Sequence, residues 1–431
     1  MKRITLLLIA ALAVVTTQAA TVGKAAYIKA HPRYAGNNYQ AYPDSVLPAL
    51  TPAPDGYTPF FLDHYGRHGS RWLINPKQYS RPVDALMKAR DAGKLTERGR
   101  QVFTTLCDVL EASDKRLGEL SDIGAEQHQR IARRMVANFP EIFYDADATV
   151  RARSTVVIRC ILSMQNEVDQ IAALCPALPI ATDASLAEMY YMNYSDPVVK
   201  PVRKQARPAL EPYRDKWLRS KTMLKKLFTD VGWAERNIDL PTFTSDLWSV
   251  AANMQSHHAF EKTDLLDIFG DDLYNLWRYE NASWYITSGN TPLTGGRVPY
   301  MEANLLRSLI EDADHAISHG STGASLRFGH ESVLLPLVCL MNVNGMGYST
   351  SDLETLDRYW TCADVFPMAG NLQLVFYRNA AGDILVKALL NEREATLPLT
   401  PVTGPYYRWA DVRNHYLRLL ADVPATPAPI E

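Results

Sequence analysis

Short apolar runs followed directly by charged residues occur three times along this chain of 431 residues. Phe60-Phe61-Leu62 leads into a group of arginine and histidine residues. Residues 149–153 alternate like a strand, and Ser154-Thr155 then have the character of a helix cap before an apolar helical segment from Val156. Residues 324–328 also alternate like a strand, before an apolar helix over 333–341. Ligands bind at the carboxyl ends of strands in open α/β sheets, and helix N-termini favour anions. The three junctions therefore predict an α/β fold with an anion site.

The remaining pattern divides into a helical middle and a hairpin. Trp, Tyr, Leu and Met recur at spacings of three and four through much of residues 171–319, which predicts a largely helical segment. Residues 372–377 and 384–389 alternate around Asn379-Ala380-Ala381-Gly382. That pattern indicates a β-hairpin, which we expect to extend the sheet at one edge in the antiparallel sense.

The N-terminus has the features of a secretory signal peptide. Lys2 and Arg3 precede an apolar run over residues 4–15, and small and polar residues follow to Ala20. The run is too short for a stable membrane anchor, and no later segment is long and apolar enough to span a bilayer. We therefore predict a signal peptide over residues 1–19, and a periplasmic or secreted protein without a membrane span.

Composition narrows the possible partners. The formal net charge is −2, so nothing general points to nucleic acid or to a membrane surface. The five cysteines lack zinc-site spacing, and export would permit up to two disulfides that the sequence does not assign.

The most specific chemistry lies in Arg67-His68-Gly69-Ser70-Arg71. Histidine is a nucleophile that forms covalent intermediates without a metal, and guanidinium groups bind phosphoryl oxygens through two parallel hydrogen bonds. Gly69 and the preceding Gly66 allow the backbone to turn sharply beside a ligand. The segment therefore indicates phosphoryl transfer to a histidine, with a small phosphorylated molecule as substrate.

Four motifs in order resemble the histidine acid phosphatase family. They are R-H-G-x-R at residues 67–71, L-S-x-x-G-x-x-Q at 120–127, R-S-T at 153–155 with a further Arg at 159, and a late His-acid pair at 330–331. The form of the first motif is most similar to bacterial multiple inositol polyphosphate phosphatases. That group usually places its acid two residues after the histidine, whereas Glu331 follows His330 immediately.

This resemblance implies a mostly parallel central sheet flanked by helices, similar to phosphoglycerate mutase, with an inserted helical cap. The implied division is an α/β core over residues 20–170 and 320–431, interrupted by the cap over 171–319. Cap loops in such proteins select the substrate, and we expect phytate or another inositol polyphosphate. A general acid phosphatase and a sugar-phosphate phosphatase remain alternatives.

The resemblance also implies roles for individual residues. His68 would attack phosphorus and Glu331 would protonate the leaving alcohol, while His330 would take part in catalysis and help to bind the phosphate. Arg159 would either support the site or contact the phosphate. Fixed cations replace a metal in such a site, so we expect no metal and no cofactor. The arginines expected to hold the phosphoryl oxygens are Arg67, Arg71 and Arg153.

Other polar residues are open to two interpretations. Residues 200–226 carry ten Lys and Arg residues, which form either a solvated helical face or a surface that attracts a polyanion. His315 and His319 are spaced to reach a metal from one helix, but no third ligand is evident, so a solvated helix is the favoured interpretation. We assign His64 and His128 to packing. A phosphomutase and a non-catalytic solute-binding protein remain the other functional classes.

Overall fold

The protein is described by a computed structural model covering residues 23–43 and 46–425. The predicted signal peptide at 1–19 lies outside these residues. None of the described helices combines the length and apolar character that crossing a bilayer requires.

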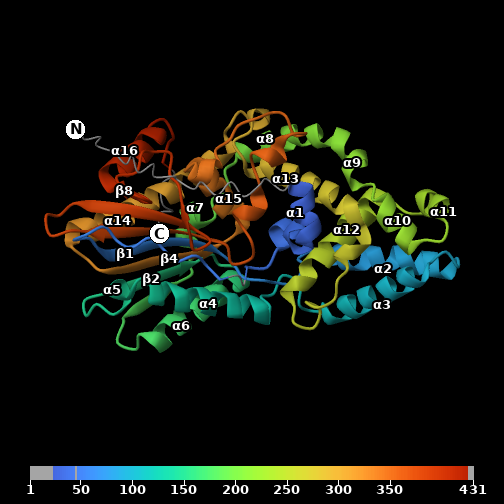
Figure 1. The fold of residues 1–431 in the computed structure, drawn as a ribbon, viewed down its shortest axis with the longest axis horizontal. Helices are drawn as coiled ribbons and strands as arrows, with labels where there is room; N and C mark the ends of the chain where they lie inside the picture. Colours follow the sequence, from blue (N-terminus) through green and yellow to red (C-terminus); the bar gives the residue numbers. More distant parts are fainter. Residues whose placement is uncertain (1–22, 44–45, 426–431) are drawn as a thin grey trace, which may run out of the picture.

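One mixed sheet organises the fold, and it confirms the α/β prediction (Figure 1). The strand order is β3-β2-β4-β1-β5-β6-β7, and β8 also pairs with β6. Strands β3, β2, β4 and β1 are parallel, and the remaining pairings are antiparallel. The strands are β1 (Thr58–Arg67), β2 (Thr149–Ser154), β3 (Ile180–Asp183), β4 (Gly323–Gly329), β5 (Asn371–Arg378), β6 (Ile384–Leu390), β7 (Arg393–Ala395) and β8 (Tyr406–Arg408).

The predicted strands are present, and two local details differ. Strands β5 and β6 form the expected hairpin. The second junction was expected to begin its helix near Val156 with a Ser-Thr cap, but β2 continues to Ser154 and the helix begins at Ile158. The helical middle also contains β3, whose four residues carry too short a pattern to be distinguished from a loop.

Helices cover both faces of the sheet, and apolar clusters fill the two interfaces. Central strands β1 and β4 are almost wholly buried because they are covered on both sides. In Figure 1, α4, α5 and α6 lie below the sheet, and α14 and α16 lie above it. The helices of these two layers are α4 (Asp122–Asn138), α5 (Pro140–Phe143), α6 (Ile158–Leu174), α7 (Met189–Met192), α14 (Ala303–His319), α15 (Glu331–Leu340) and α16 (Trp409–Leu419).

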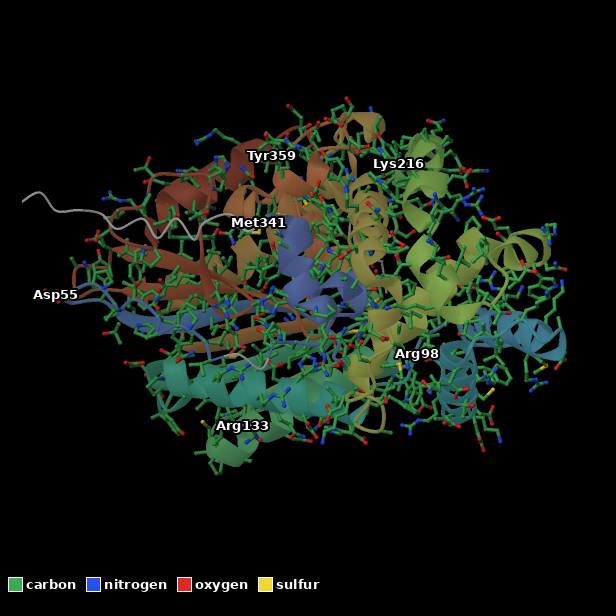
Figure 2. All side chains as sticks on the ribbon, turned by 45° about the vertical axis from the view of Figure 1, so that its right-hand side comes forward. Asp55, Arg98, Arg133, Lys216, Met341 and Tyr359 are labelled. Carbon is green, nitrogen blue, oxygen red and sulfur yellow. The ribbon has the colours of Figure 1, made fainter. Side chains whose placement is uncertain are left out.

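A second group of helices, which forms the helical end of the molecule, lies on the right in Figure 1 and has its own apolar core. Helices α2 and α3 come from before the predicted cap, yet α2 packs on α12 and α3 on α10. The division at residues 170 and 319 stays a prediction. In Figure 2, Arg98 of α3 and Lys216 of α9 lie on this helical end, and Arg133 of α4 lies under the sheet. The helices are α1 (Lys24–Ala30), α2 (Pro76–Asp91), α3 (Glu97–Ala112), α8 (Val199–Ala206), α9 (Glu211–Leu218), α10 (Lys221–Leu227), α11 (Val231–Asn237), α12 (Leu240–Asn253) and α13 (Leu273–Ser288).

Candidate active site

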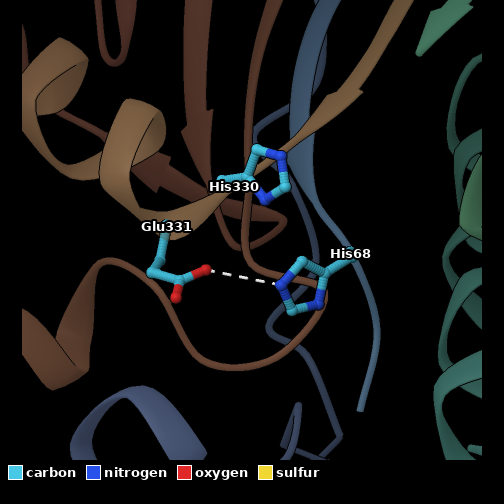
Figure 3. A group of neighbouring side chains, drawn as sticks. All are labelled: His68, His330 and Glu331. Atoms are coloured by element: carbon cyan, nitrogen blue, oxygen red, sulfur yellow. Dashed lines mark ion pairs between the residues drawn. The ribbon is translucent and has the colours of Figure 1, made fainter. Parts of the chain in front are cut away.

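The first and third junctions meet where β1 and β4 end side by side. Arg67 and Gly329 are paired at the last register position of the two parallel strands. The backbone N–H of His68 then donates to the carbonyl of Gly329 at 2.9 Å. His68 and His330 consequently face each other with ring centroids 5.8 Å apart, and Glu331 lies beside them (Figure 3).

Two glycines allow this close approach. A Cβ atom on Gly69 would lie 2.4 Å from the carbonyl oxygen of Gly124, so the loop after His68 fits against the start of α4 only without a side chain. A Cβ atom on Gly329 would lie 2.0 Å from the hydroxyl oxygen of Tyr65. The serine of the L-S-x-x-G-x-x-Q motif caps the start of α4, because the side chain of Ser121 accepts from the N–H of Gly124.

Hydrogen bonding leaves one nitrogen of His68 available as a nucleophile. The Nδ1 atom lies 2.9 Å from the carbonyl oxygen of Gly69, which can only accept a hydrogen bond, so Nδ1 carries the proton. The Nε2 atom has no hydrogen-bond partner, and it lies 3.4 Å from Oε2 of Glu331. Burial lowers the pKa of His68 well below its ordinary value despite the nearby carboxylate, so the ring is neutral.

Two arginines of the first motif flank His68 with incompletely used donors. Nε of Arg67 donates to Glu331 at 3.0 Å and Nη1 donates to the carbonyl of Phe366 at 2.7 Å, while Nη2 is buried without a partner. Nη1 of Arg71 donates to the carbonyl of Trp72 at 2.9 Å, and its Nε has no partner. Buried donors of this kind are suited to an anionic ligand.

The third arginine at the site is Arg159. Its helix, α6, begins against the nucleophile loop: the Gly69 N–H donates to Oγ of Ser163 at 3.1 Å, and that hydroxyl donates to the Arg159 carbonyl at 2.8 Å. Burial and, to a smaller extent, the positive charge of Arg159 lower the pKa of His330. Burial also lowers the pKa of Arg159, and the negative charge of Glu331 partly offsets that effect. The Nε atom of Arg159 is also buried without a partner.

Arg153, which the sequence predicted to bind phosphate, contacts other partners in the structure. Nη1 of Arg153 donates to the Tyr191 hydroxyl at 2.9 Å, and Nη2 donates to Asp312 of α14 and to Ser325 of β4. These partners lie along the strands, under α14. Because β2 extends through Ser154, the Arg153 side chain is directed into this network, and Arg159 contributes the charge at the junction instead.

Arg153 belongs to a second, internally balanced charge cluster. Arg327 of β4 pairs with Asp63 of β1 and also reaches Asp312 at 2.6 Å. Although burial opposes it, Arg327 and Arg153 hold the pKa of Asp312 below its ordinary value. Two guanidinium groups therefore meet two aspartates in the interior.

His330 is fixed from three directions. Its Nε2 lies 3.3 Å from Oγ1 of Thr155, the thiol of Cys160 lies 3.8 Å from both ring nitrogens, and its backbone N–H donates to the Tyr65 hydroxyl. Burial lowers the pKa of His330 to about 4. Sequence reasoning interpreted Thr155 as a helix cap and did not assign Cys160 or Tyr65. Cys160 and Tyr65 lie directly beside motif residues in the sequence, and this proximity was the signal that could have identified them.

The carboxylate of Glu331 is ionised in this arrangement. Burial alone would raise its pKa, but the positive charges of Arg67 and Arg71 outweigh burial and hold the pKa well below its ordinary value. The ligand atoms of His68, His330 and Glu331 lie within 4.8 Å of one another, close enough for one metal ion. Three neighbouring guanidinium groups oppose a cation there and favour an anion, so this donor set does not suit a resident metal.

The other histidines take the positions expected from packing or solvation. His64 and His128 are buried, and His128 pairs with Glu167 at 2.8 Å. His315 and His319 stack on each other near the exposed end of α14. All five cysteines are free.

Comparison with known proteins agrees with the fold and the motifs. The chain is 24% identical over 407 residues to human multiple inositol polyphosphate phosphatase 1, covering 84% of this chain and 80% of that protein. No family model matches the chain. The sequence match makes the chain a homologue of that phosphatase, which is consistent with the histidine acid phosphatase resemblance.

Solved structures extend the likeness to the whole fold. The Bifidobacterium longum multiple inositol polyphosphate phosphatase, in complex with inositol hexasulfate, matches with a TM-score of 0.73 and 19% identity over 92% of this chain and 100% of that one. The phytase of D. castellii matches with a TM-score of 0.66 and 13% identity over 91% and 86% of the two chains. The chain therefore has the α/β fold of these phosphatases.

Proposed function

We propose that the protein is a histidine-type phosphomonoesterase that hydrolyses inositol polyphosphates, with phytate as the leading substrate. The central observation is a neutral buried histidine with a free Nε2, surrounded by three guanidinium groups that face one carboxylate. Phosphoryl transfer requires mainly positioning and stabilisation of charge, and this arrangement supplies both. The names of the human and Bifidobacterium longum phosphatases and of the D. castellii phytase favour the same chemistry.

In the first step, Nε2 of His68 attacks phosphorus. A nitrogen–phosphorus bond forms while the bond from phosphorus to the ester oxygen breaks, and the proton stays on Nδ1, which donates a hydrogen bond to the Gly69 carbonyl. Arg67, Arg71 and Arg159 hold the phosphoryl oxygens, with His330 as a neutral partner. Neutral His330 can donate one hydrogen bond without adding a fourth positive charge.

Glu331 transfers the protons. A bound phosphate dianion places negative charge between Glu331 and the arginines, and a like charge raises the pKa of a carboxyl group. Glu331 thereby becomes able to protonate the leaving alcohol. In the second step it accepts a proton from water, which attacks phosphorus, breaks the nitrogen–phosphorus bond and releases phosphate.

The basic segment at 200–226 separates into different environments. Arg207, from the 3-10 helix η3 (Arg207–Leu210), lines a cavity near the site. Lys216 pairs with Glu354 at 2.9 Å, and the carbonyl of Asp267 accepts from Lys226 on the side of α10 near α3. We propose that the first part of the segment, and not α10, attracts a polyphosphorylated substrate.

We also propose that the mature protein is exported, and that residues 171–319 contribute most of a helical cap that borders the cleft. Support for export comes from the N-terminal sequence pattern. Expression of the full chain followed by cell fractionation tests it: a product shortened by about 19 residues in the exported fraction is expected from the predicted cleavage site, and an uncleaved product in the cytoplasm would contradict it.

A substrate panel tests the proposed activity. Phosphate release would be measured from phytate, glucose 1-phosphate and 4-nitrophenyl phosphate, with His68→Ala as the blank. Preferential release from phytate is expected. Release from the aryl and sugar phosphates alone would indicate a general acid phosphatase, transfer of labelled phosphate between two alcohols without net release would indicate a mutase, and binding without turnover would indicate a solute-binding protein.

A further inference from the structure

A polar cavity of about 290 Å³ lies beside the active site, on the side of the helical end. Two contacts connect it to the catalytic arginines. The Arg71 guanidinium lies over the ring of Tyr39 at 6.0 Å, and Tyr39 lines the cavity. The Arg67 guanidinium lies 5.7 Å from the ring of Phe366, which packs edge-on at 4.9 Å against Trp284 on another wall.

The lining has the chemistry of a site for a hydroxyl-rich group that carries one anionic substituent. Its walls come from η1 (Pro32–Tyr39), α2, η3, α12 and α13, so it is built by the helical end and not by the sheet. The indole Nε1 of Trp248 is buried without a partner, which leaves a donor at this wall. The uncharged polar residues at the cavity are Asn38, Gln78, Ser245, Ser249, Ser283 and Thr287.

Only two of the described lining residues are charged, Arg207 and Glu280. Burial raises the pKa of Glu280 to about 7. The titratable groups around it are Arg207 from η3, Tyr39 from η1, Tyr279 and the thiol of Cys362. Burial and the charge of Glu280 both raise the pKa values of Tyr279 and Cys362. None of these is a cation paired with Glu280, so the carboxyl is neutral in mild acid and becomes negative above neutral pH.

We propose that this cavity binds the part of the substrate beyond the scissile phosphate, and that Glu280 sets how much negative charge is accepted there. This inference rests on the proposed phosphatase function. A neutral Glu280 donates a hydrogen bond to a second phosphate that Arg207 holds. An ionised Glu280 repels that phosphate and favours an alcohol without one, because like charges in a partly desolvated cavity are costly.

Competitive inhibition provides a test in which the ligand itself does not titrate. Inositol hexasulfate keeps its charge from pH 5 to pH 8. This range begins about two units below the pKa of Glu280 and ends about one unit above it. Its inhibition constant would be measured against 4-nitrophenyl phosphate hydrolysis, with inorganic sulfate as a probe of the catalytic cluster alone. The wild type is expected to lose about tenfold more affinity for the hexasulfate than for sulfate over this pH range, and Glu280→Gln is expected to remove that difference.

Two further variants separate the possible outcomes. Glu97→Gln, on exposed α3, should behave as the wild type. Ser283→Phe fills the cavity from a half-buried position and should weaken inhibition by the hexasulfate. Inhibition by sulfate and turnover of the aryl phosphate should stay within about twofold of the wild type. If Glu280→Gln and Ser283→Phe both retain the wild-type profile in an active enzyme, the cavity inference is wrong. If the wild type hydrolyses no phosphate ester, the proposed function itself fails.

Discussion

Two groups of buried arginines in this protein differ in how their charge is balanced. Arg153 and Arg327 lie along the strands beneath α14, where they meet Asp63 and Asp312. Arg67, Arg71 and Arg159 gather at the carboxyl ends of the strands around Glu331 alone.

The difference separates an arginine that supports the fold from one that is available to a ligand. A balanced buried cluster loses much of its stability when one partner is removed, because the other charge is left uncompensated. An excess of positive charge is costly in the free protein and is relieved by an anion. The active-site group therefore gives up stability for binding, and the interior group does not.

The largest effect is expected from removing the nucleophile within the positively charged group. His68→Ala should lower kcat by about 10⁴-fold or more on every substrate, because the arginines alone cannot form the covalent intermediate. Steady-state phosphate release measures this loss. His258→Ala, at an exposed position outside the site, is the control, and near-normal turnover by His68→Ala would overturn the mechanism.

The single carboxylate of the positively charged group should be most important for poor leaving groups. Glu331→Gln is expected to slow hydrolysis of an alkyl phosphate by about 10²–10⁴-fold and of 4-nitrophenyl phosphate much less, because a good leaving group needs little protonation. Equal losses on both substrates would restrict Glu331 to the activation of water.

The pH profile gives a second test of Glu331. In the free enzyme its pKa is held well below the ordinary value, and bound phosphate raises it. The descending limb of kcat, which reports the enzyme–substrate complex, should therefore lie at higher pH than the descending limb of kcat/KM. Coincident limbs in the wild type would contradict a substrate-raised pKa.

A matched pair of alanine variants compares the two arginine groups directly. Arg159→Ala should lower kcat/KM by about 10²-fold and change the melting temperature little, because it removes a ligand contact. Arg153→Ala should lower the free energy of unfolding by on the order of 3 kcal/mol, because Asp312 loses a partner, with a smaller effect on the kcat/KM of the folded protein. The reverse result would restore Arg153 as the phosphate-binding residue.

The smallest expected effect concerns the basic segment outside both groups. Arg207→Gln should raise KM for phytate several-fold relative to 4-nitrophenyl phosphate, and the difference should shrink at high salt because exposed charges are screened beyond about 8–10 Å. Lys226→Gln, on α10, is the matched control and should leave the ratio unchanged. Equal effects of the two variants would show that only the general charge of the segment is important.

The sequence predicted the parts of the fold that depend on local pattern. Strands β1, β2 and β4 were recognisable because buried strands are followed at once by chemically specific residues, and the β5–β6 hairpin has a turn signal. The joining of α2 and α3 to the distant helical end was not predictable, because packing partners far apart in sequence leave no periodic signal in either segment.

The separation of Arg153 from Arg159 has a similar cause. Both arginines flank one junction, and the sequence pattern there does not indicate which of the two lies beside the catalytic histidines. The presence of Asp312 on α14 as a partner for Arg153 became apparent only once the tertiary structure placed it there.

The most direct test is to trap the covalent intermediate. A rapid acid-free quench of the wild type during turnover of ³²P-labelled phytate, followed by peptide mapping, should find acid-labile, base-stable phosphate on the peptide that contains His68, and His68→Ala should carry none. Label on another residue, or steady turnover without any label under conditions where dephosphorylation is slowed, would contradict a mechanism in which Nε2 of His68 attacks phosphorus within the excess positive charge of the three arginines.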